Sequence, residues 1–461
     1  MTERADVVVI GMGPGGEQVA GELAADGLDV VGIEANLVGG ECPYYGCIPS
    51  KMMIRAADAL AEARRVNEIA GTAEVHPDLT PVATRIREEA TTDWDDTIAA
   101  DRFTDAGGRL IRGRARLVAP RTVQVGDHQI QARRAVVLNT GTSPAVPPID
   151  GLDQVRYWTN RDAVRATSAP ESMIVLGGGP IGAEFAQAFA RFGTRVSVVE
   201  AAERLLPGEE PAASEVLAEA FRGEGIEVLT GDGAASVRSH SAGIAVQVGE
   251  RELVAERLLV ATGRDTGLDR LGLDAYGLDT AARTLAVDGF CRVLDSAGAP
   301  IEDLYAIGDV TGRGAFTHMS MYQAEIALAH LRGDEPVEAE YHAVPRVTFT
   351  DPEVGAVGLS EAQAREQGVP VRSTSVQVPS STRGWIHGVG NDGVISLVAH
   401  AESRMLLGAT SVGPRGGEVL GLLTLAVQQR LPVHALTRMI YAYPTFHRGV
   451  LDAAQQWLSE G

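Results

Sequence analysis

The chain has 461 residues, of which 45% are hydrophobic and 22% charged, and its formal net charge is −21. This charge argues against nucleic acid and against an anionic membrane surface as partners, because the sequence offers no basic tract to neutralise phosphates. No apolar run approaches the ~20 residues of a membrane helix, and the N-terminus has no secretory pattern. Three cysteines are too few for an extracellular disulfide framework. We therefore expect a reducing, cytoplasmic location.

The first predicted unit is a strand, a glycine-rich turn, a helix and a second strand. Residues 7–10 (VVVI) predict a buried strand, and Gly11, Gly13 and Gly16 follow with GxGxxG spacing. A helix and a second strand then lead to Glu34. In such a unit the first glycine permits a tight turn, the second lets the backbone approach a pyrophosphate, and the third allows close helix–strand packing. The acid can hydrogen-bond a ribose hydroxyl.

The next segment, GGECPYYGCIPSK at 39–51, contains Cys42, Cys47 and Lys51, the only lysine in the chain. Three interpretations of the cysteine pair are open. Zinc would need about four ligands, but the nearest histidine is His76 and the third cysteine is remote. Two inert buried thiols are disfavoured because the glycines of the segment indicate close backbone approach. A redox-active pair fits best, since a nearby positive charge such as Lys51, one helical turn past Cys47, stabilises a thiolate.

A second nucleotide unit follows later in the chain. A predicted strand at 173–176 precedes Gly177, Gly179 and Gly182, and after a helix another strand ends in Glu200. In both units the acid lies eighteen residues after the third glycine. One GxGxxG alone is weak support, but the whole unit occurs twice with the same spacing, so the sequence predicts two dinucleotide sites.

The remaining segments outline the rest of the molecule. Residues 53–100 are expected to be helical and charged, and 110–150 to form short strands. A β-rich stretch from 226 leads to Gly263, and a later strand-to-turn segment ends at Asp309. After about residue 341, strands and helices alternate without a glycine-rich nucleotide turn, which predicts a separate C-terminal domain.

Together these motifs resemble the flavin-dependent pyridine nucleotide–disulfide oxidoreductases, a family that includes dihydrolipoamide dehydrogenase, glutathione reductase and mercuric reductase. The resemblance covers essentially the whole chain and includes ATGR at 261–264, YAIGDV at 305–310 and TFTDPEVGAVGLSE at 348–361. It implies an α/β fold with two Rossmann-like dinucleotide-binding domains and an α+β C-terminal dimerisation domain, and hence a homodimer. The implied divisions are an FAD-binding domain at 1–150 completed by about 271–340, an NAD(P)-binding domain at 151–270, and the C-terminal domain at 341–461.

The resemblance also implies roles for individual residues. For FAD these are Gly11, Gly13 and Gly16 at the pyrophosphate, Glu34 at the ribose, Asp309 at the ribityl chain, and Thr140 and Gly141 close by. Cys47 is implied to face the flavin and Cys42 to meet the substrate, with Lys51 paired to Glu184. The residues implied to hold the nicotinamide dinucleotide are Gly177, Gly179, Gly182, Glu200 and Gly263.

Glu200 favours NADH, because a carboxylate would repel the 2′-phosphate of NADPH. Arg195 and Arg204 lie close in sequence and weaken this inference, so NADPH stays possible.

The C-terminal segment YAYPTFHRG departs from the family pattern. Thiol-handling members have a histidine, supplied by the other subunit, where this chain has Tyr443, and a glutamate where it has Arg448. Tyrosine has a pKa of about 10 and is a poor base at neutral pH. His447 could substitute as the base, but the more ordinary interpretation is a partly exposed helix-start residue. Likewise His318 is expected to pack or hydrogen-bond rather than act in catalysis.

The mercuric reductases share a tyrosine at that position but rely on a second, C-terminal cysteine pair. This chain has no cysteine after Cys291, which is expected to be an inert buried thiol in a strand-like run. The sequence therefore predicts an FAD enzyme that passes electrons from NAD(P)H to Cys42–Cys47 and on to a small-molecule acceptor: a disulfide, a quinone or a metal ion. A flavoprotein redox sensor with little turnover, or a mercuric reductase-like metal-ion reductase, is the alternative. No resident metal is predicted.

Overall fold

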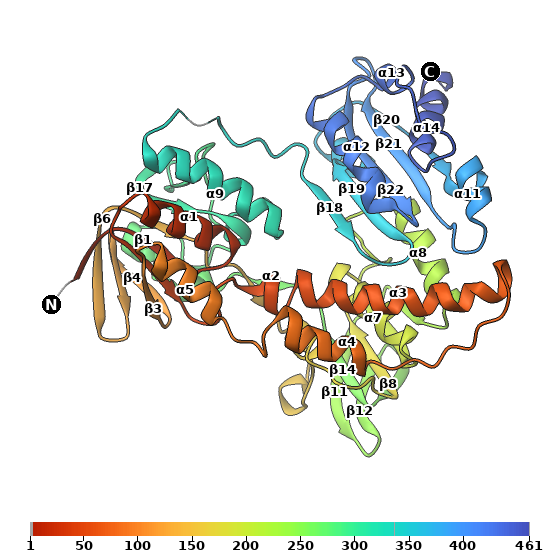
Figure 1. The fold of residues 1–461 in the computed structure, drawn as a ribbon, viewed down its shortest axis with the longest axis horizontal. Helices are drawn as coiled ribbons and strands as arrows, with labels where there is room; N and C mark the ends of the chain where they lie inside the picture. The colour runs from red at the N-terminus through yellow and green to blue at the C-terminus, as the bar shows by residue number, and fades with distance from the viewer. Residues whose placement is uncertain (1–2, 336, 461) are drawn as a thin grey trace. The chain divides into compact units, whose positions relative to one another are not determined.

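The computed structural model describes residues 3–335 and 337–460. Two compact units make up the chain. Unit 1 comprises residues 1–49, 85–145 and 264–341, and unit 2 comprises residues 50–84, 146–263 and 342–461. Both units combine helices with sheets, so the predicted α/β class is confirmed (Figure 1). The boundaries of the three predicted domains stay a prediction.

Unit 1 contains a sheet with the strand order β16-β17-β6-β1-β2-β3, and a β4–β5 hairpin extends it from β6. Pairings among β17, β6, β1, β2 and β3 are parallel. Helices α1 and α9 lie side by side over it (Figure 1). The strands are β1 (Glu3–Ile10), β2 (Val30–Glu34), β3 (Arg109–Arg112), β4 (Ala115–Ala119), β5 (Thr122–Val125), β6 (His128–Leu138), β16 (Arg292–Leu294) and β17 (Pro300–Ala306), with a small β7 (Ser143–Pro144) and β15 (Arg264–Asp265) pair.

The apolar run that predicted the first strand is buried on both faces. Val7 and Val9 pack into a cluster with residues of α1 and α9, whereas Val8 and Ile10 pack into a second cluster on the other side of the sheet. A strand covered on both faces needs apolar residues at every position rather than at alternate ones. The helices of this unit are α1 (Pro14–Ala25), α2 (Glu41–Tyr44), α5 (Thr97–Asp105), α9 (Thr317–Arg332), a π-helical turn (Ile86–Ala90), and 3-10 turns at Leu268–Arg270, Leu273–Tyr276 and Gly308–Thr311.

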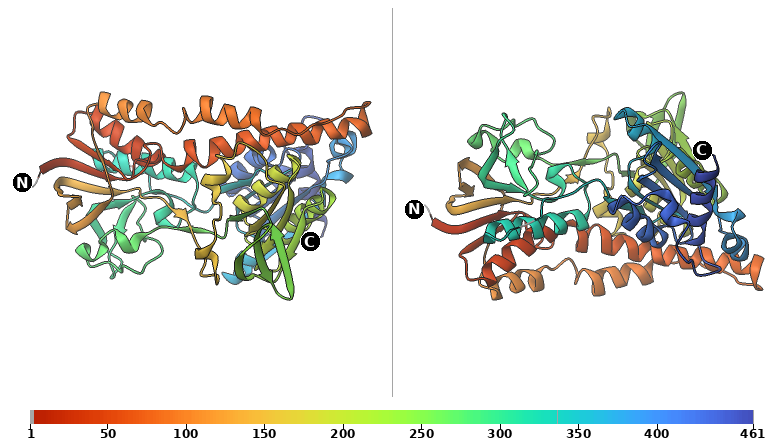
Figure 2. Two further views of the ribbon diagram at one scale, coloured as in Figure 1. Left: turned by 90° about the horizontal axis from the view of Figure 1, so that it is seen from below. Right: turned by 90° about the horizontal axis from the view of Figure 1, so that it is seen from above.

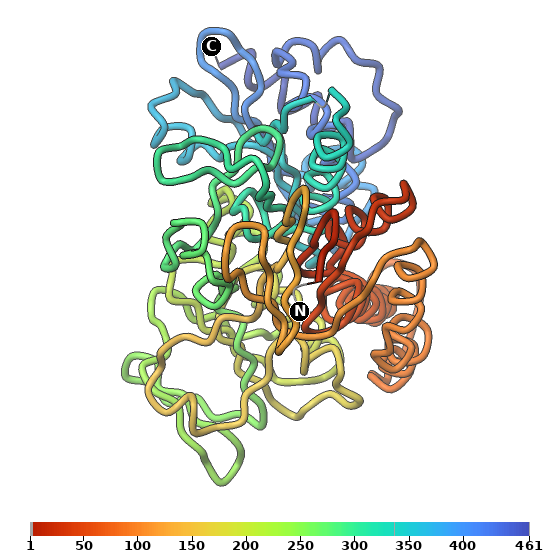
Figure 3. The backbone as a smooth tube through the Cα atoms, turned by 90° about the vertical axis from the view of Figure 1, so that its left-hand side faces the viewer, coloured from red at the N-terminus to blue at the C-terminus, as the bar shows by residue number. Residues whose placement is uncertain are grey.

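Unit 2 contains a four-stranded parallel sheet with the order β10-β9-β8-β14 and a three-stranded antiparallel sheet, β11-β12-β13. The β11–β12 hairpin can be followed in Figures 1 and 3. These strands are β8 (Ser172–Leu176), β9 (Arg195–Glu200), β10 (Glu227–Thr230), β11 (Ala234–His240), β12 (Gly243–Val248), β13 (Arg251–Ala255) and β14 (Arg257–Val260). The helical elements among them are α6 (Asn160–Ala163), α7 (Pro180–Arg191), α8 (Pro211–Gly223) and a 3-10 turn (Leu152–Gln154).

The C-terminal part of unit 2 is an antiparallel five-stranded sheet with the order β18-β19-β22-β21-β20. Helices α12 and α14 bury apolar residues against it, including Leu423, Val450 and Trp457. The strands are β18 (Pro345–Thr348), β19 (Glu353–Gly358), β20 (Val371–Gln377), β21 (Val394–His400) and β22 (Leu406–Gly413). The helices are α10 (Glu361–Glu366), α11 (Thr382–His387), α12 (Gly416–Gln428), α13 (Val433–Leu436) and α14 (Arg448–Ser459), with a 3-10 turn at Val378–Ser380.

The predicted helical region 53–100 is interrupted twice. The long helix α3 (Cys47–Ile69) ends well before α4 (Thr80–Arg85), and residues 91–96 form turns rather than helix (Figure 2). Within the described residues, no helix is both long and apolar enough to cross a membrane.

A nearly buried arginine joins several elements of unit 2. The side chain of Arg191, 2% exposed, lies at the end of α7 and pairs with Asp58 of α3 at 2.6 Å, with Glu224 at 2.6 Å and with Asp351 at 2.8 Å. The guanidinium geometry allows several hydrogen bonds to carboxylates at once. Arg191 therefore connects α3, α7, the chain after α8 and the β18–β19 connection.

Replacing Arg191 with methionine should destabilise the protein, because three carboxylates would lose a buried cation. Breaking a buried ion pair typically costs about 3–5 kcal/mol. Urea unfolding should show this loss for Arg191→Met. Arg238→Met is a matched control, since Arg238 pairs with Glu252 at an exposed position of the same unit, and such pairs contribute about 1 kcal/mol or less. Equal midpoints for the two variants would contradict this account.

Candidate active site

The first glycine-rich turn has the geometry that its three glycines predict. Gly11 has a φ of +92°, and a Cβ there would lie 2.2 Å from the carbonyl oxygen of Asn139. A Cβ on Gly16 would lie 2.0 Å from the carbonyl oxygen of Gly11, so the third glycine permits the contact between helix and turn. Gly13 directly precedes α1, and the first residue of that helix is a proline. The helix N-terminus thus begins at the turn, as a pyrophosphate site requires.

Glu34 fixes this turn from the end of β2. Its carboxylate accepts hydrogen bonds from the backbone N–H of Met12 at 2.8 Å and of Asn36 at 2.7 Å. Burial raises the pKa of Glu34, while the two backbone N–H groups favour the ionised form and oppose the increase. The acid therefore holds the protein backbone in addition to any ribose contact that its remaining lone pairs allow.

The residues expected beside FAD lie at the ends of neighbouring strands in unit 1. Thr140 and Gly141 follow β6, and the Asp309 carboxylate accepts a hydrogen bond from the Thr142 hydroxyl at 2.6 Å. The hydroxyl of Thr140 is buried without a hydrogen-bond partner, and the space beside Gly141 is open within 4 Å. An orphaned hydroxyl next to open space and a glycine-rich helix start fits a polar cofactor, so these residues suit a dinucleotide such as FAD.

The segment with the two cysteines packs tightly in unit 1. Gly39 donates its N–H to the Met12 carbonyl at 2.7 Å, and a Cβ on Gly40 would lie 2.9 Å from the Cα of Gly13. The close approach that these glycines predict is therefore present, and it places the segment against the first nucleotide turn. Cys42 lies in α2 and Cys47 begins α3; both are half-buried.

The two thiols interact with each other and with one hydroxyl. The pKa of Cys42 is raised, first by the thiol of Cys47 and then by burial. The sulfur of Cys47 lies 3.4 Å from the hydroxyl oxygen of Thr317, at the start of α9. Since Cys47 is the first residue of a long helix, the helix dipole favours its thiolate form. The start of α3 therefore favours a thiolate at Cys47, whereas the raised pKa favours a protonated thiol at Cys42.

The lone lysine forms the ion pair that the family resemblance implies. The ammonium nitrogen of Lys51 lies 2.8 Å from a carboxylate oxygen of Glu184 and 4.8 Å from the ring centre of Phe349. The other Glu184 oxygen accepts the backbone N–H of Phe349 at 2.9 Å. Glu184 is therefore buried with both oxygens bonded, and it fixes the ammonium group one helical turn after Cys47 on α3.

The second glycine-rich turn repeats the first within unit 2. Gly177 has a φ of +103°, and a Cβ on Gly182 would lie 1.9 Å from the carbonyl oxygen of Gly177. Glu200 accepts the N–H of Gly178 at 2.6 Å and of Ala202 at 2.8 Å. The spaces beside Gly179 and Gly263 are open within 4 Å. The pattern suits a second dinucleotide.

The two arginines near Glu200 differ in position. Arg195 begins β9 and Glu200 ends it, so about five residues at ~3.3 Å each separate them. Arg204 donates to the carbonyl oxygens of Pro207 and Glu209 at 2.8 and 2.9 Å, and its Nε atom is buried without a partner. Arg204 lies four residues after Glu200 in the chain, so it is the nearer of the two arginines along the backbone.

The C-terminal segment holds its candidate residues at the surface of unit 2. Tyr443 is 64% exposed and donates its hydroxyl hydrogen to Thr382 at 3.2 Å, while the Arg448 guanidinium lies 5.3 Å from its ring centre. His447 is the half-buried N-cap of α14, as the ordinary interpretation predicted. His318 is exposed and stacks on Phe316 at 5.1 Å.

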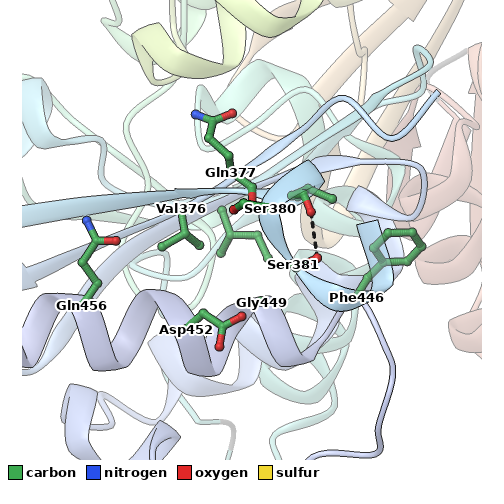
Figure 4. A pocket seen from close by; sticks show the side chains of 10 residues that line it. Val376, Gln377, Ser380, Ser381, Phe446, Gly449, Asp452 and Gln456 are labelled. Atoms are coloured by element: carbon green, nitrogen blue, oxygen red, sulfur yellow. Dashed lines mark hydrogen bonds between the residues drawn. The ribbon is translucent and has the colours of Figure 1, made fainter. Parts of the chain in front are cut away.

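A cavity of about 250 Å³ lies between α14 and strands β20 and β21 (Figure 4). Its lining includes Phe446, Ser381 and Asp452, which points toward the cavity from α14. No residue predicted for catalysis or cofactor binding lines it. It is therefore not a candidate active site.

The structure also describes the surroundings of the third cysteine and the grouping of side chains that could bind a metal. Cys291 is fully buried, and burial raises the pKa of its thiol to about 12, which agrees with an inert thiol. The strand expectation for it was wrong: Cys291 has a φ of +66° in a turn directly before β16. No group of three or more His, Cys, Asp and Glu side chains within 3–335 and 337–460 is arranged to hold a metal ion.

Sequence reasoning missed two residues of this region. Thr317, which contacts the Cys47 sulfur, is one of many threonines and has no distinguishing local pattern. Phe349, which contacts both Lys51 and Glu184, lies inside the TFTDPEVGAVGLSE segment already quoted for its resemblance, and that position was the available signal.

Comparisons with known proteins identify the family of the chain and several of its relatives. Residues 5–327 match the family described as pyridine nucleotide-disulphide oxidoreductase, and residues 344–454 match its dimerisation domain. The sequence is 32% identical to the dihydrolipoyl dehydrogenase of Haloferax volcanii, over 99% of this chain and 96% of that protein. It is 34% identical to the mercuric reductase of Acidithiobacillus ferrooxidans, over 97% and 82%.

One solved structure with a similar fold is the HOCl-induced flavoprotein disulfide reductase RclA from Escherichia coli. The TM-score is 0.83 at 25% identity, over 98% of this chain and 99% of that one. A Cu(II) complex of the same protein gives a TM-score of 0.84 at 25% identity, over 99% of this chain and 100% of that one.

The raised pKa of Cys42 predicts how the reduced protein reacts with iodoacetamide. Because only the thiolate reacts and the Cys42 thiol ionises above its usual range, its alkylation rate should rise about tenfold per pH unit from pH 7 to 9. Peptide mapping after timed alkylation would separate Cys42 from Cys47. A Cys42 rate that levels off below pH 8 would contradict the assignment.

Proposed function

Since the chain belongs to the pyridine nucleotide-disulphide oxidoreductase family, whose members use FAD and a pyridine nucleotide, we propose that it passes electrons from NAD(P)H through FAD to Cys42–Cys47 and then to a small-molecule acceptor. The observation that carries this proposal is the pair of half-buried thiols beside the first nucleotide turn. FAD would be held by the Gly11–Gly16 turn, Glu34, Thr140 and Asp309.

Bound FAD would supply two-electron chemistry between the nicotinamide and the disulfide. The protein's own contribution begins at the sulfurs. When the disulfide takes up two electrons and one proton, the S–S bond breaks, Cys47 keeps its sulfur as a thiolate, and Cys42 holds the proton. The α3 N-terminus, the Thr317 hydroxyl and Lys51 favour this arrangement, since each offers positive charge or a hydrogen-bond donor.

The charge-transfer absorbance of the reduced protein tests this proposal. Partial reduction of the wild type should produce a long-wavelength band, because a Cys47 thiolate would lie against the flavin. Cys47→Ser should abolish the band, and Cys42→Ser should show it without added reductant. A reduced wild type without the band would exclude the redox pair.

For the nicotinamide, we propose NADH as the preferred donor. Glu200 already accepts two backbone N–H groups, and its carboxylate would lie near a 2′-phosphate. Arg195 starts the strand that Glu200 ends, which removes it from this region. Arg204, whose buried Nε–H group has no hydrogen-bond partner, is the residue that would support NADPH.

We therefore expect kcat/KM to favour NADH by about tenfold, the effect of one unfavourable contact of about 1.4 kcal/mol. Glu200→Ala should reduce that preference. Steady-state rates with both donors check this. If NADPH is used equally well by the wild type, and Arg204→Ala removes that use, then Arg204 controls the site.

We propose that the acceptor is one that needs no strong base. The family's dimerisation domain at 344–454 and the exposed Trp385 (76%), Ile440 (97%) and Tyr443 (64%) support a homodimer. In such a dimer the C-terminal segment would present Tyr443 and Arg448 to the thiols of the other subunit. The Arg448 guanidinium lies over the Tyr443 ring. Neither side chain supplies the imidazole base or the carboxylate that thiol-handling members of the family have at these positions.

Quinones or soft metal ions should therefore be reduced faster than lipoamide or glutathione disulfide. A positioned base contributes about 100- to 10,000-fold to proton transfer, so Tyr443→His with Arg448→Glu should raise the lipoamide-to-quinone rate ratio by about 100-fold. Assays of both acceptors with both proteins check this. If wild-type lipoamide turnover already equals quinone turnover, the missing-base argument fails, and His447→Ala tests the remaining candidate.

A second candidate function is a flavoprotein redox sensor. The exposed Tyr443, with the half-buried Arg448 over its ring, favours a sensor over an efficient disulfide reductase, because turnover with disulfides would lack a base. A sensor would be reduced by NADH but would turn over slowly with every acceptor of the panel.

A further inference from the structure

The turn at Thr91–Asp96 in unit 1 has an unusual backbone. Thr92, Asp93 and Trp94 have φ angles of +48°, +57° and +58° in succession. Residues with a Cβ rarely enter this left-handed region, and a β-branched residue such as Thr92 is an outlier there. A π-helical turn (Ile86–Ala90) immediately precedes the segment. Such backbone persists only where the surrounding structure fixes it.

The side chains of this segment reach both ends of the Val38–Tyr44 stretch that contains Cys42. The indole N–H of Trp94 donates to the carbonyl oxygen of Tyr44, the last residue of α2, at 3.1 Å. The Asp96 carboxylate accepts the backbone N–H of Val38 at 2.6 Å. One contact therefore lies before Gly39 and Gly40, and the other follows Cys42.

Both contacts are themselves supported. Asp96, whose side chain is 12% exposed, forms a two-point ion pair with Arg112 at 2.6 and 2.9 Å. The buried Thr91 hydroxyl donates to the Ile86 carbonyl at 3.0 Å and accepts the N–H of Trp94 at 3.3 Å. The left-handed turn is thus held at its start and its end.

We propose that Trp94 and Asp96 are positioning residues for the Cys42 thiol. They hold the Val38–Tyr44 stretch through its first N–H and its last carbonyl, while Gly39 and Gly40 pack it against the first nucleotide turn. The inference rests on the proposed redox role of Cys42 for its functional meaning. Cys42 must keep one position relative to Cys47 while the S–S bond opens and closes, and α2 has one turn of helix to hold it.

Trp94→Phe tests this by removing only the indole N–H. The net loss of one hydrogen bond changes a local equilibrium by about 3- to 10-fold. The amides of Tyr45 and Gly46, which bond to the Glu41 carbonyl, should exchange hydrogen 3- to 10-fold faster by mass spectrometry. In the reduced protein, alkylation of Cys42 relative to Cys47 should rise by a similar factor. Amides of α9 in the same unit should be unchanged.

Trp457→Phe is the matched control, since its indole N–H also donates to a backbone carbonyl, that of Arg372, at 3.1 Å. It should change neither the exchange at Tyr45 nor the Cys42-to-Cys47 alkylation ratio. For the other contact, Asp96→Ala should accelerate both readouts, and Asp96→Asn, which keeps one oxygen for Val38, should largely restore them.

Trp94→Phe with both readouts within twofold of the wild type would overturn the proposal, even if the melting temperature fell, because Trp94 would then serve packing alone. Neither readout requires electron transfer. A wild type without a charge-transfer band, combined with faster Cys42 alkylation in Trp94→Phe, would reject the proposed function and leave the positioning role intact.

Discussion

In each nucleotide unit, one carboxylate at the end of a strand determines the shape of the glycine-rich turn. Glu34 accepts the N–H of Met12, and Glu200 accepts the N–H of Gly178, each the second residue of its motif. Both acids also accept the N–H two residues later. Movement of either turn would break hydrogen bonds to its carboxylate, and the cost is greatest at Glu34, which is buried. The helix start that would meet a pyrophosphate is thereby fixed.

The cysteine segment depends on the first of these turns, because Gly39 bonds to Met12 and Gly40 packs on Gly13. From Cys47 onward the chain continues as α3. Three of its charged residues, spaced seven apart, form ion pairs: Lys51 with Glu184, Asp58 with Arg191, and Arg65 with Asp351. Within unit 2, three successive ion pairs therefore hold α3 from Lys51 onward. Lysine at the first of these positions presents a compact charge that also lies over the Phe349 ring.

Much of this arrangement could be predicted from the sequence, because local backbone requirements leave a pattern. Glycines at fixed spacing predicted both turns and their close contacts, and a run of four valine and isoleucine residues predicted the buried strand. The additional partners of Glu34 and Glu200 could not be predicted, since they depend on how strand ends meet in space. Cys291 was misassigned because GFCRVL is typical of a strand. The signal for a turn was Asp288, whose carboxylate accepts the N–H groups of Phe290 and Arg292. The left-handed turn at 92–94 has no glycine or asparagine to indicate it.

The central claim, that Cys42 and Cys47 form a second redox centre beside the flavin, is tested most directly by counting electrons. Anaerobic titration with dithionite should reduce each wild-type subunit with about two electron pairs, one for the flavin and one for the disulfide. Cys47→Ser should take up about one pair. A wild-type protein that is fully reduced by a single pair would contradict the claim.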